Sequence, residues 1–97
     1  MAKGIQSISI GFRLLKAIVD SDAPLPLKTL AGMAKMSPSS ARMYLISLIE
    51  TGLVAQNSQS GLYSLGPYTT HLGARAIKRI DLMEIASEAM RSLRQAT

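Results

Sequence analysis

Residues 28–54, KTLAGMAKMSPSSARMYLISLIETGLV, contain two short apolar-periodic runs separated by a tight break at Met36-Ser37-Pro38. Apolar spacings of three and four residues on both sides of the break predict two helices. Ser37 offers a capping oxygen and Pro38 suits the first position of a helix, so the second helix is predicted from Pro38 to about Thr51. Gly52 follows where a helix often ends in a left-handed residue. Two helices joined so closely must cross near their joint, as in a helix-turn-helix.

The segments around this pair predict a mainly α fold with a small β-hairpin. Besides residues 38–51, helices are predicted over residues 5–19, 27–35, 67–79 and from 81 to the chain end. Ser7 is the expected N-cap of the first, and Asp81 should cap the last, with Glu84 at capping-box spacing. Strand-like runs at 53–56 and 62–65 bracket a polar loop at 57–61. Three helices followed by a hairpin is the order of a winged helix-turn-helix, expected over residues 1–80, with a linker helix over 81–97.

Composition narrows the class of protein. No cysteine is present, which excludes disulfides and thiolate metal sites. The N-terminus lacks the apolar run of a signal peptide, and no stretch is long enough to span a membrane, so a cytoplasmic location is expected. The net charge of +5 and a pI near 10.0 favour polyanionic partners such as DNA, RNA or acidic lipid.

The outward side of the predicted helix 38–51 is polar at its N-terminal end. Opposite the apolar stripe lie Ser39, Ser40 and Arg42, followed by Met43 and Ile46. The major groove of B-DNA admits one α-helix, and the short connection holds the other helix behind it. Free N–H groups at such a helix start attract phosphate, and an arginine can contact a guanine edge or a phosphate. The pattern therefore predicts that this helix reads double-stranded DNA in a sequence-specific manner.

Ten side chains are predicted to face the DNA. Met43 is expected to meet a thymine methyl group, and Lys28 and Lys35 to neutralise backbone phosphates. The hairpin loop has no arginine or lysine, so Gln59 and Ser60 should add only polar contacts. The predicted set is Lys28, Lys35, Ser37, Ser39, Ser40, Arg42, Met43, Ser47, Gln59 and Ser60.

The first predicted helix is apolar on two faces. One stripe lies at residues 5, 8, 12, 15 and 19, and further apolar residues lie at 10, 14, 17 and 18. A helix that packs on one side needs one stripe, so the second face predicts contact with another copy of the chain, with a simply buried helix as the alternative. Gly11 would allow close approach of that copy's backbone. The predicted dimer-interface residues are Ile5, Ile8, Ile10, Gly11 and Leu14.

Motifs along nearly the whole chain resemble the N-terminal domain of IclR-type transcriptional regulators. They are Ile5-Gln6-Ser7, Arg13-Leu14-Leu15, Leu27-Lys28-Thr29-Leu30-Ala31, Met36-Ser37-Pro38-Ser39-Ser40-Ala41 with Leu45 and Leu48, Gly52-Leu53-Val54, Tyr63-Ser64-Leu65-Gly66-Pro67 and His71-Leu72-Gly73. The resemblance implies a dimeric transcription factor on a partly palindromic operator, whose small-molecule effector binds a second domain absent from this chain. Met43 and Ile10 stand where the family often has arginine, and the usual wing arginines are missing, so no operator sequence is implied.

Other functions fit the sequence less well. Catalysis is not expected, since the single histidine, His71, has no cysteine or nearby carboxylate partner and is expected to be partly buried in a structural role. Neither a cofactor nor a metal is predicted. A basic amphipathic helix on a membrane surface is a minor alternative. The main alternative is a winged helix used as a protein-interaction or oligomerisation module without DNA binding.

Overall fold

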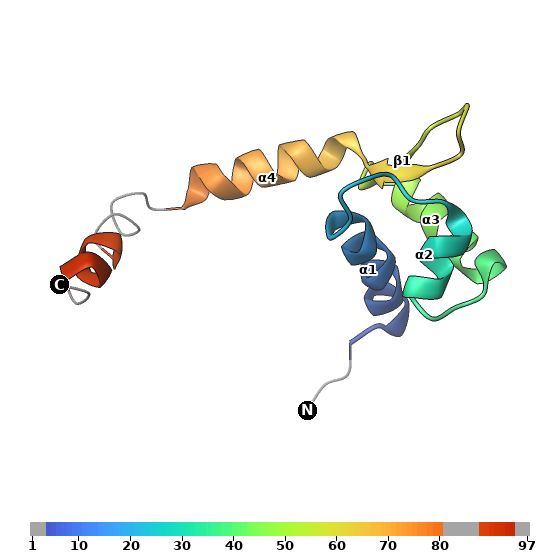
Figure 1. Ribbon diagram of the computed structural model, residues 1–97, viewed down its shortest axis with the longest axis horizontal. Helices are drawn as coiled ribbons and strands as arrows, with labels where there is room; N and C mark the ends of the chain where they lie inside the picture. The colour runs from blue at the N-terminus through green and yellow to red at the C-terminus, as the bar shows by residue number, and fades with distance from the viewer. Residues whose placement is uncertain (1–3, 81–87, 95–97) are drawn as a thin grey trace.

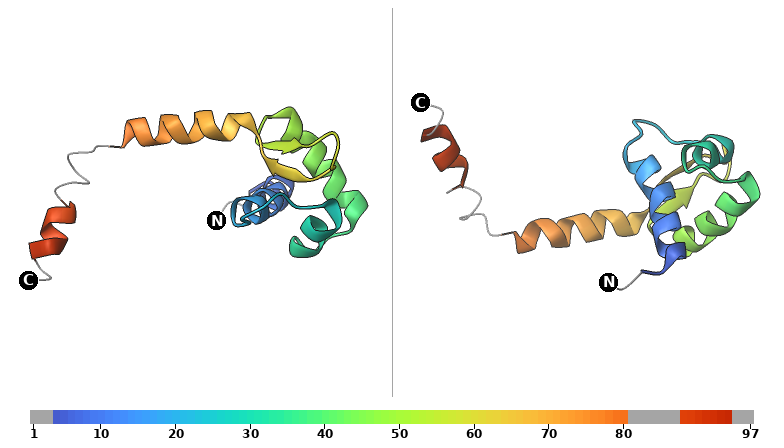
Figure 2. Two further views of the ribbon diagram at one scale, coloured as in Figure 1. Left: turned by 45° about the horizontal axis from the view of Figure 1, so that its top comes forward. Right: turned by 90° about the horizontal axis from the view of Figure 1, so that it is seen from below.

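The computed structural model describes residues 4–80 and 88–94. Its elements follow the order α1 (Gln6–Val19), α2 (Leu27–Met33), α3 (Pro38–Glu50), β1 (Val54–Gln56), β2 (Tyr63–Leu65) and α4 (Pro67–Arg79) (Figure 1). Residues 88–94 are also helical. The first three helices and the hairpin form one body, and α4 projects from it as a single extended helix (Figure 2). The winged helix-turn-helix predicted from the sequence is confirmed.

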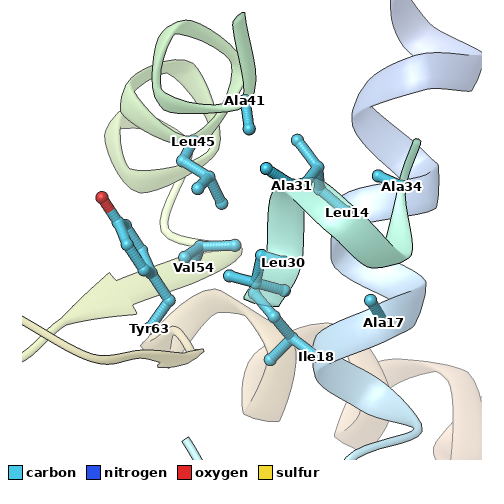
Figure 3. Close-up of a cluster of buried hydrophobic side chains, with 10 residues drawn as sticks. All are labelled: Leu14, Ala17, Ile18, Leu30, Ala31, Ala34, Ala41, Leu45, Val54 and Tyr63. Atoms are coloured by element: carbon cyan, nitrogen blue, oxygen red, sulfur yellow. The ribbon is translucent and has the colours of Figure 1, made fainter. Parts of the chain in front are cut away.

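The body is held together by one apolar cluster. Figure 3 shows side chains from α1, α2, α3 and the hairpin converging on it. Its buried members are Leu14, Ala17, Ile18, Leu30, Ala31, Ala34, Ala41, Leu45, Val54 and Tyr63. Four of the ten are alanines, and their small side chains allow the three helices to approach closely. Burial of apolar surface stabilises the fold by roughly 25 cal/mol per Å². The side chains that α3 buries in this cluster therefore fix the position of α3 on the body.

The joint between α2 and α3 ends the first helix earlier than predicted. Helix α2 stops at Met33 rather than near residue 35, because Lys35 adopts a left-handed conformation with φ of 57°. The N–H of Lys35 donates to the carbonyl of Gly32 at 3.2 Å, and that of Met36 to Ala31 at 3.0 Å. These two bonds form a Schellman motif in which a lysine occupies the position that glycine usually takes.

Helix α3 begins and ends as its sequence predicts, within one residue. The Ser37 hydroxyl accepts a hydrogen bond from the N–H of Ser40 at 3.2 Å, and Pro38 occupies the first helical position. At the other end Gly52 has φ of 83° and donates to Ile49, while Leu53 donates to Leu48. The predicted cap, proline and glycine are therefore confirmed.

The hairpin carries an additional pairing that was not predicted as sheet. Strands β1 and β2 are antiparallel, with Val54 opposite Leu65 and Gln56 opposite Tyr63. Leu25, in the extended segment between α1 and α2, pairs with Tyr63 through N–H to O bonds of 2.9 and 2.8 Å in opposite directions. The backbone before α2 is thereby tied to the wing.

Gly66 connects the hairpin to α4 at a point where backbones nearly touch. Its N–H donates to the carbonyl of Leu53 at 2.9 Å, and the N–H of Tyr68 donates to that of Gly52 at 2.9 Å. A Cβ on Gly66 would overlap the Gly52 carbonyl oxygen and lie 2.9 Å from the N atom of Val54. The glycine of the Tyr63-Ser64-Leu65-Gly66 motif thus has a steric cause.

Several expectations for α1 are wrong. The N-cap is Ile5, with no side-chain hydrogen bond, and Ser7 lies inside the helix. Leu14 is fully buried in the core and cannot contact a second copy. Gly11 is buried as well, and an added Cβ would lie 3.9 Å from Tyr44 Cδ1, so the chain itself covers this glycine. Of the two apolar faces of α1, the one that contains Leu14 was expected to be free, and it is the one that packs in the core.

At the C-terminal end, α4 matches its predicted bounds and has no buried residue. The expected cap at Asp81 and its partner Glu84 lie outside the described residues.

Candidate nucleic-acid interface

Helix α3 is fixed on one side and open on the other. Ala41 and Leu45 are buried, and Tyr44, Leu48 and Ile49 pack partly against the core. On the opposite side Ser39, Ser40, Arg42, Met43 and Ser47 are all exposed. No described segment of the chain covers this outer face of α3.

The first turn of α3 offers hydrogen-bond donors at one end of that face. The Ser37 hydroxyl is used as the cap and lies 3.4 Å from the Ser39 hydroxyl. Within the described part of the chain, the Ser39 N–H has no acceptor. Because helix N-termini carry partial positive charge and unsatisfied N–H groups, this turn is suited to an anionic oxygen.

The predicted cations are exposed and available. Lys28 lies near the start of α2, Lys35 in the α2–α3 turn, and Arg42 on α3. None forms an ion pair with a residue that the structure describes, whereas Lys16 of α1 pairs with Asp20, the C-cap of that helix, at 2.7 Å. The three cations on or next to the helix pair therefore keep their full attraction for phosphate, subject to salt screening.

Side-chain hydrogen bonds order the wing loop, and Asn57 makes two of them. Asn57 Oδ1 accepts hydrogen bonds from the N–H groups of Gln59 and Ser60, both at 2.9 Å. The Gly61 N–H donates to the Asn57 carbonyl at 2.8 Å. Gln59 and Ser60 are both exposed at the loop. This loop lies on a different element from the outer face of α3 (Figure 1).

All ten predicted DNA-contacting side chains are exposed, and six of them belong to α3 or its cap. Ser47 also lines an apolar groove of about 240 Å³ between α1 and α3, so it marks the edge of the outer face rather than its centre. Besides Pro38 in the first turn, two exposed residues of α3 were not in the predicted set: Ile46, although it was expected to point outward, and Glu50. Helical spacing of three and four from Met43 could have found both.

Other chemistries find no support among the described residues. His71 is exposed, not partly buried as expected, and its ring lies 5.7 Å from that of Tyr68. No group of three or more histidine, cysteine, aspartate or glutamate side chains is placed to bind a metal within the described ranges. Among the same residues, no helix has the length and apolar character needed to cross a bilayer.

Comparison with known proteins identifies a family whose domain covers the same helices. The IclR helix-turn-helix domain matches residues 7–58, which cover α1, α2, α3 and β1. The chain belongs to the IclR family. The family match rests on the elements that present the outer face of α3, and residues 38–50 supply the second helix of its helix-turn-helix.

Three relatives with known names are longer than this chain. The HTH-type transcriptional regulator KdgR of Escherichia coli (strain K12) is 31% identical over 93 residues, covering 96% of this chain and 35% of KdgR. The transcriptional repressor IclR of the same strain is 26% identical over 89 residues, covering 92% of this chain and 32% of the repressor. The crystal structure of Pseudomonas aeruginosa HmgR superposes with a TM-score of 0.73 at 28% identity, over 95% of this chain and 38% of HmgR. The chain thus spans about a third of each relative.

Proposed function

We propose that this chain is the DNA-binding part of a transcriptional regulator, with α3 in the major groove of double-stranded DNA. One observation supports this proposal most directly. The apolar side of α3 is locked into the core while its hydroxyl and guanidinium side, at Ser39, Ser40 and Arg42, is uncovered. A recognition helix requires this arrangement, because the groove must meet a rigid polar surface.

Phosphate contacts are assigned to groups that flank α3. Lys35 in the turn and Lys28 on α2 are unpaired cations, and the Ser39 N–H lacks an acceptor in the described chain. Such contacts fix the position of the protein on the duplex without reading sequence. Gln59 and Ser60 on the wing add polar contacts only, so affinity should depend mainly on the helix pair.

The regulator is proposed to bind as a homodimer on a partly palindromic operator. The N-cap Ile5 and, on α1, Ile8 and Phe12 are exposed, and Ile10 is half-buried. Exposed apolar clusters of this kind often mark protein interfaces. On α4, the apolar side chains of Leu72 and Ile77 are uncovered too.

The two parts of the chain are proposed to have different roles. Residues 1–80 form the DNA-binding domain, and 81–97 connect it to a domain that senses a small-molecule effector outside this chain. The greater length of the relatives supports this division, as does the departure of α4 from the body (Figure 1).

Selection of bound duplexes from a random pool, followed by titration at two salt concentrations, tests the proposed function. The expected result is an inverted-repeat motif and an affinity that falls as salt rises, because released counterions drive binding. Absence of binding at low salt, or binding without salt dependence, would reject DNA recognition.

If DNA recognition is rejected, the result would favour a protein-interaction module. The uncovered apolar residues of α1 and α4 are the observation that favours this second candidate. The named relatives are transcriptional regulators rather than enzymes, so catalysis is not proposed.

A further inference from the structure

Two large apolar side chains stand in the middle of the outer face of α3. Met43 is 66% exposed and Ile46 is 43% exposed, and they are three residues apart on the helix. Residues at this spacing are neighbours on a helix surface. The core cluster on the other side of α3 contains neither of them. They are therefore not core residues, and each leaves a substantial part of its side chain open to solvent.

The groups around this pair indicate what it meets. Ser39 lies one turn before Met43, Arg42 lies beside it, and both are exposed and unpaired with any carboxylate in the described chain. A protein partner that buried the two apolar side chains would also have to accommodate the cation and the hydroxyl groups around them. The major groove of DNA provides phosphates for the cation, base-edge acceptors for the hydroxyls, and one apolar group for the pair, the C5 methyl of thymine.

We propose that Met43 and Ile46 together recognise thymine methyl groups, and so make the half-site depend on A·T pairs at the centre of the α3 contact. This inference rests on the proposed DNA binding and names which base pairs that binding selects. Arg42 then serves the guanine edge or phosphate at the border of the same contact.

Helix geometry limits how far apart the two thymines lie. Three residues advance an α-helix by about 4.5 Å. Base pairs are stacked roughly 3.4 Å apart along the duplex. Met43 and Ile46 therefore reach methyl groups on adjacent base pairs, or on two base pairs with one other pair between them.

Glu50 sets the C-terminal limit of this contact. It is exposed and lies four residues after Ile46, on the same side of α3. Its carboxylate repels phosphate oxygens, which favours insertion of the N-terminal half of α3. The apolar pair thus lies between an attractive helix start and a repulsive helix end.

Replacement of thymine by deoxyuridine tests the proposal, because it removes only the C5 methyl. The 97-residue chain is first used to select its site from random duplexes. Affinity is then measured by fluorescence anisotropy on that site with each thymine replaced in turn. Burial of one methyl group corresponds to about a fourfold gain in affinity, so in each half-site two positions should each lose roughly that factor.

Variants connect the two sensitive positions to the two side chains. Met43→Ala should make one position indifferent to uracil, and Ile46→Ala the other. Met33→Ala removes a methionine that is 52% exposed on α2, and should leave both sensitivities unchanged. Circular dichroism on each variant checks that folding is retained, which is expected because neither α3 side chain belongs to the core cluster.

The outcomes separate the two proposals. Salt-dependent binding that does not change when uracil replaces thymine would overturn thymine recognition by Met43 and Ile46 and leave DNA binding intact. A selected half-site without thymine would do the same. Uracil sensitivity that persists in both α3 variants would overturn it as well. Absence of any DNA binding would instead reject the proposed function.

Discussion

Arg42 is the guanidinium that α3 presents on its outer side, exposed and without an ion-pair partner in the described chain. If it makes a bidentate contact with a guanine, Arg42→Ala should weaken binding to the selected site by about 1–3 kcal/mol and relax preference at one position. Arg42→Lys keeps the charge but loses the planar fork, so it should recover phosphate attraction without base preference. Anisotropy on the site and on single-base variants measures both. An unchanged affinity and base preference in Arg42→Ala would remove this residue from the interface.

Lys35 combines a charge that should help binding with a conformation that opposes folding. Its φ of 57° places a side chain where L-residues are strained by roughly 1–2 kcal/mol. Lys35→Gly should therefore raise the free energy of unfolding by about 0.5–1 kcal/mol, since part of the relief is offset by glycine's unfolded-state entropy. Urea denaturation measures the change.

The same lysine is predicted to contact a phosphate, and a second variant separates the two effects. Lys35→Ala keeps the strained Cβ but removes the charge. Both variants should lower the salt slope of DNA binding by about one unit per protomer. Equal stabilities for the glycine and alanine variants would contradict the strain, and an unchanged slope would contradict the phosphate contact.

At the scale of elements, α1 is apolar on two sides but only one is used by the core. Ile8 is 70% exposed and Phe12 is 58% exposed on the free side. Ile8→Asp should shift the protein towards monomer, because a carboxylate in an apolar interface must be desolvated. Sedimentation equilibrium measures the dimer dissociation constant, with the exposed Ser9→Asp as a matched control. A dissociation constant that does not change would exclude this face of α1 from the dimer.

For the whole molecule, the salt dependence of binding reports how many phosphates the proposed dimer contacts. Each protomer contributes its own Lys28, so Lys28→Ala should reduce the slope of log affinity against log salt by about 1.8 units. Lys16→Ala is the control, because Lys16 is already paired with Asp20 on α1. A change close to 0.9 would indicate binding by one protomer, and no change would place Lys28 away from the backbone.

Local sequence alone determined much of this protein. The helix pair, its capping serine and proline, the left-handed Gly52 and the polar outer side of α3 all follow from preferences that act within a few residues. Helix α4 follows similarly from Gly66-Pro67. Such features need no knowledge of the distant chain.

Only the tertiary structure decided which of two similar faces is buried and which backbones meet. Periodicity could not tell that Leu14 of α1 enters the core while Ile8 remains outside, because both faces are apolar and the choice depends on α2 and α3. The pairing of Leu25 with Tyr63 and the contact of Gly66 with Gly52 likewise join residues far apart in the chain. Their energies come from packing between segments, which a local pattern does not contain.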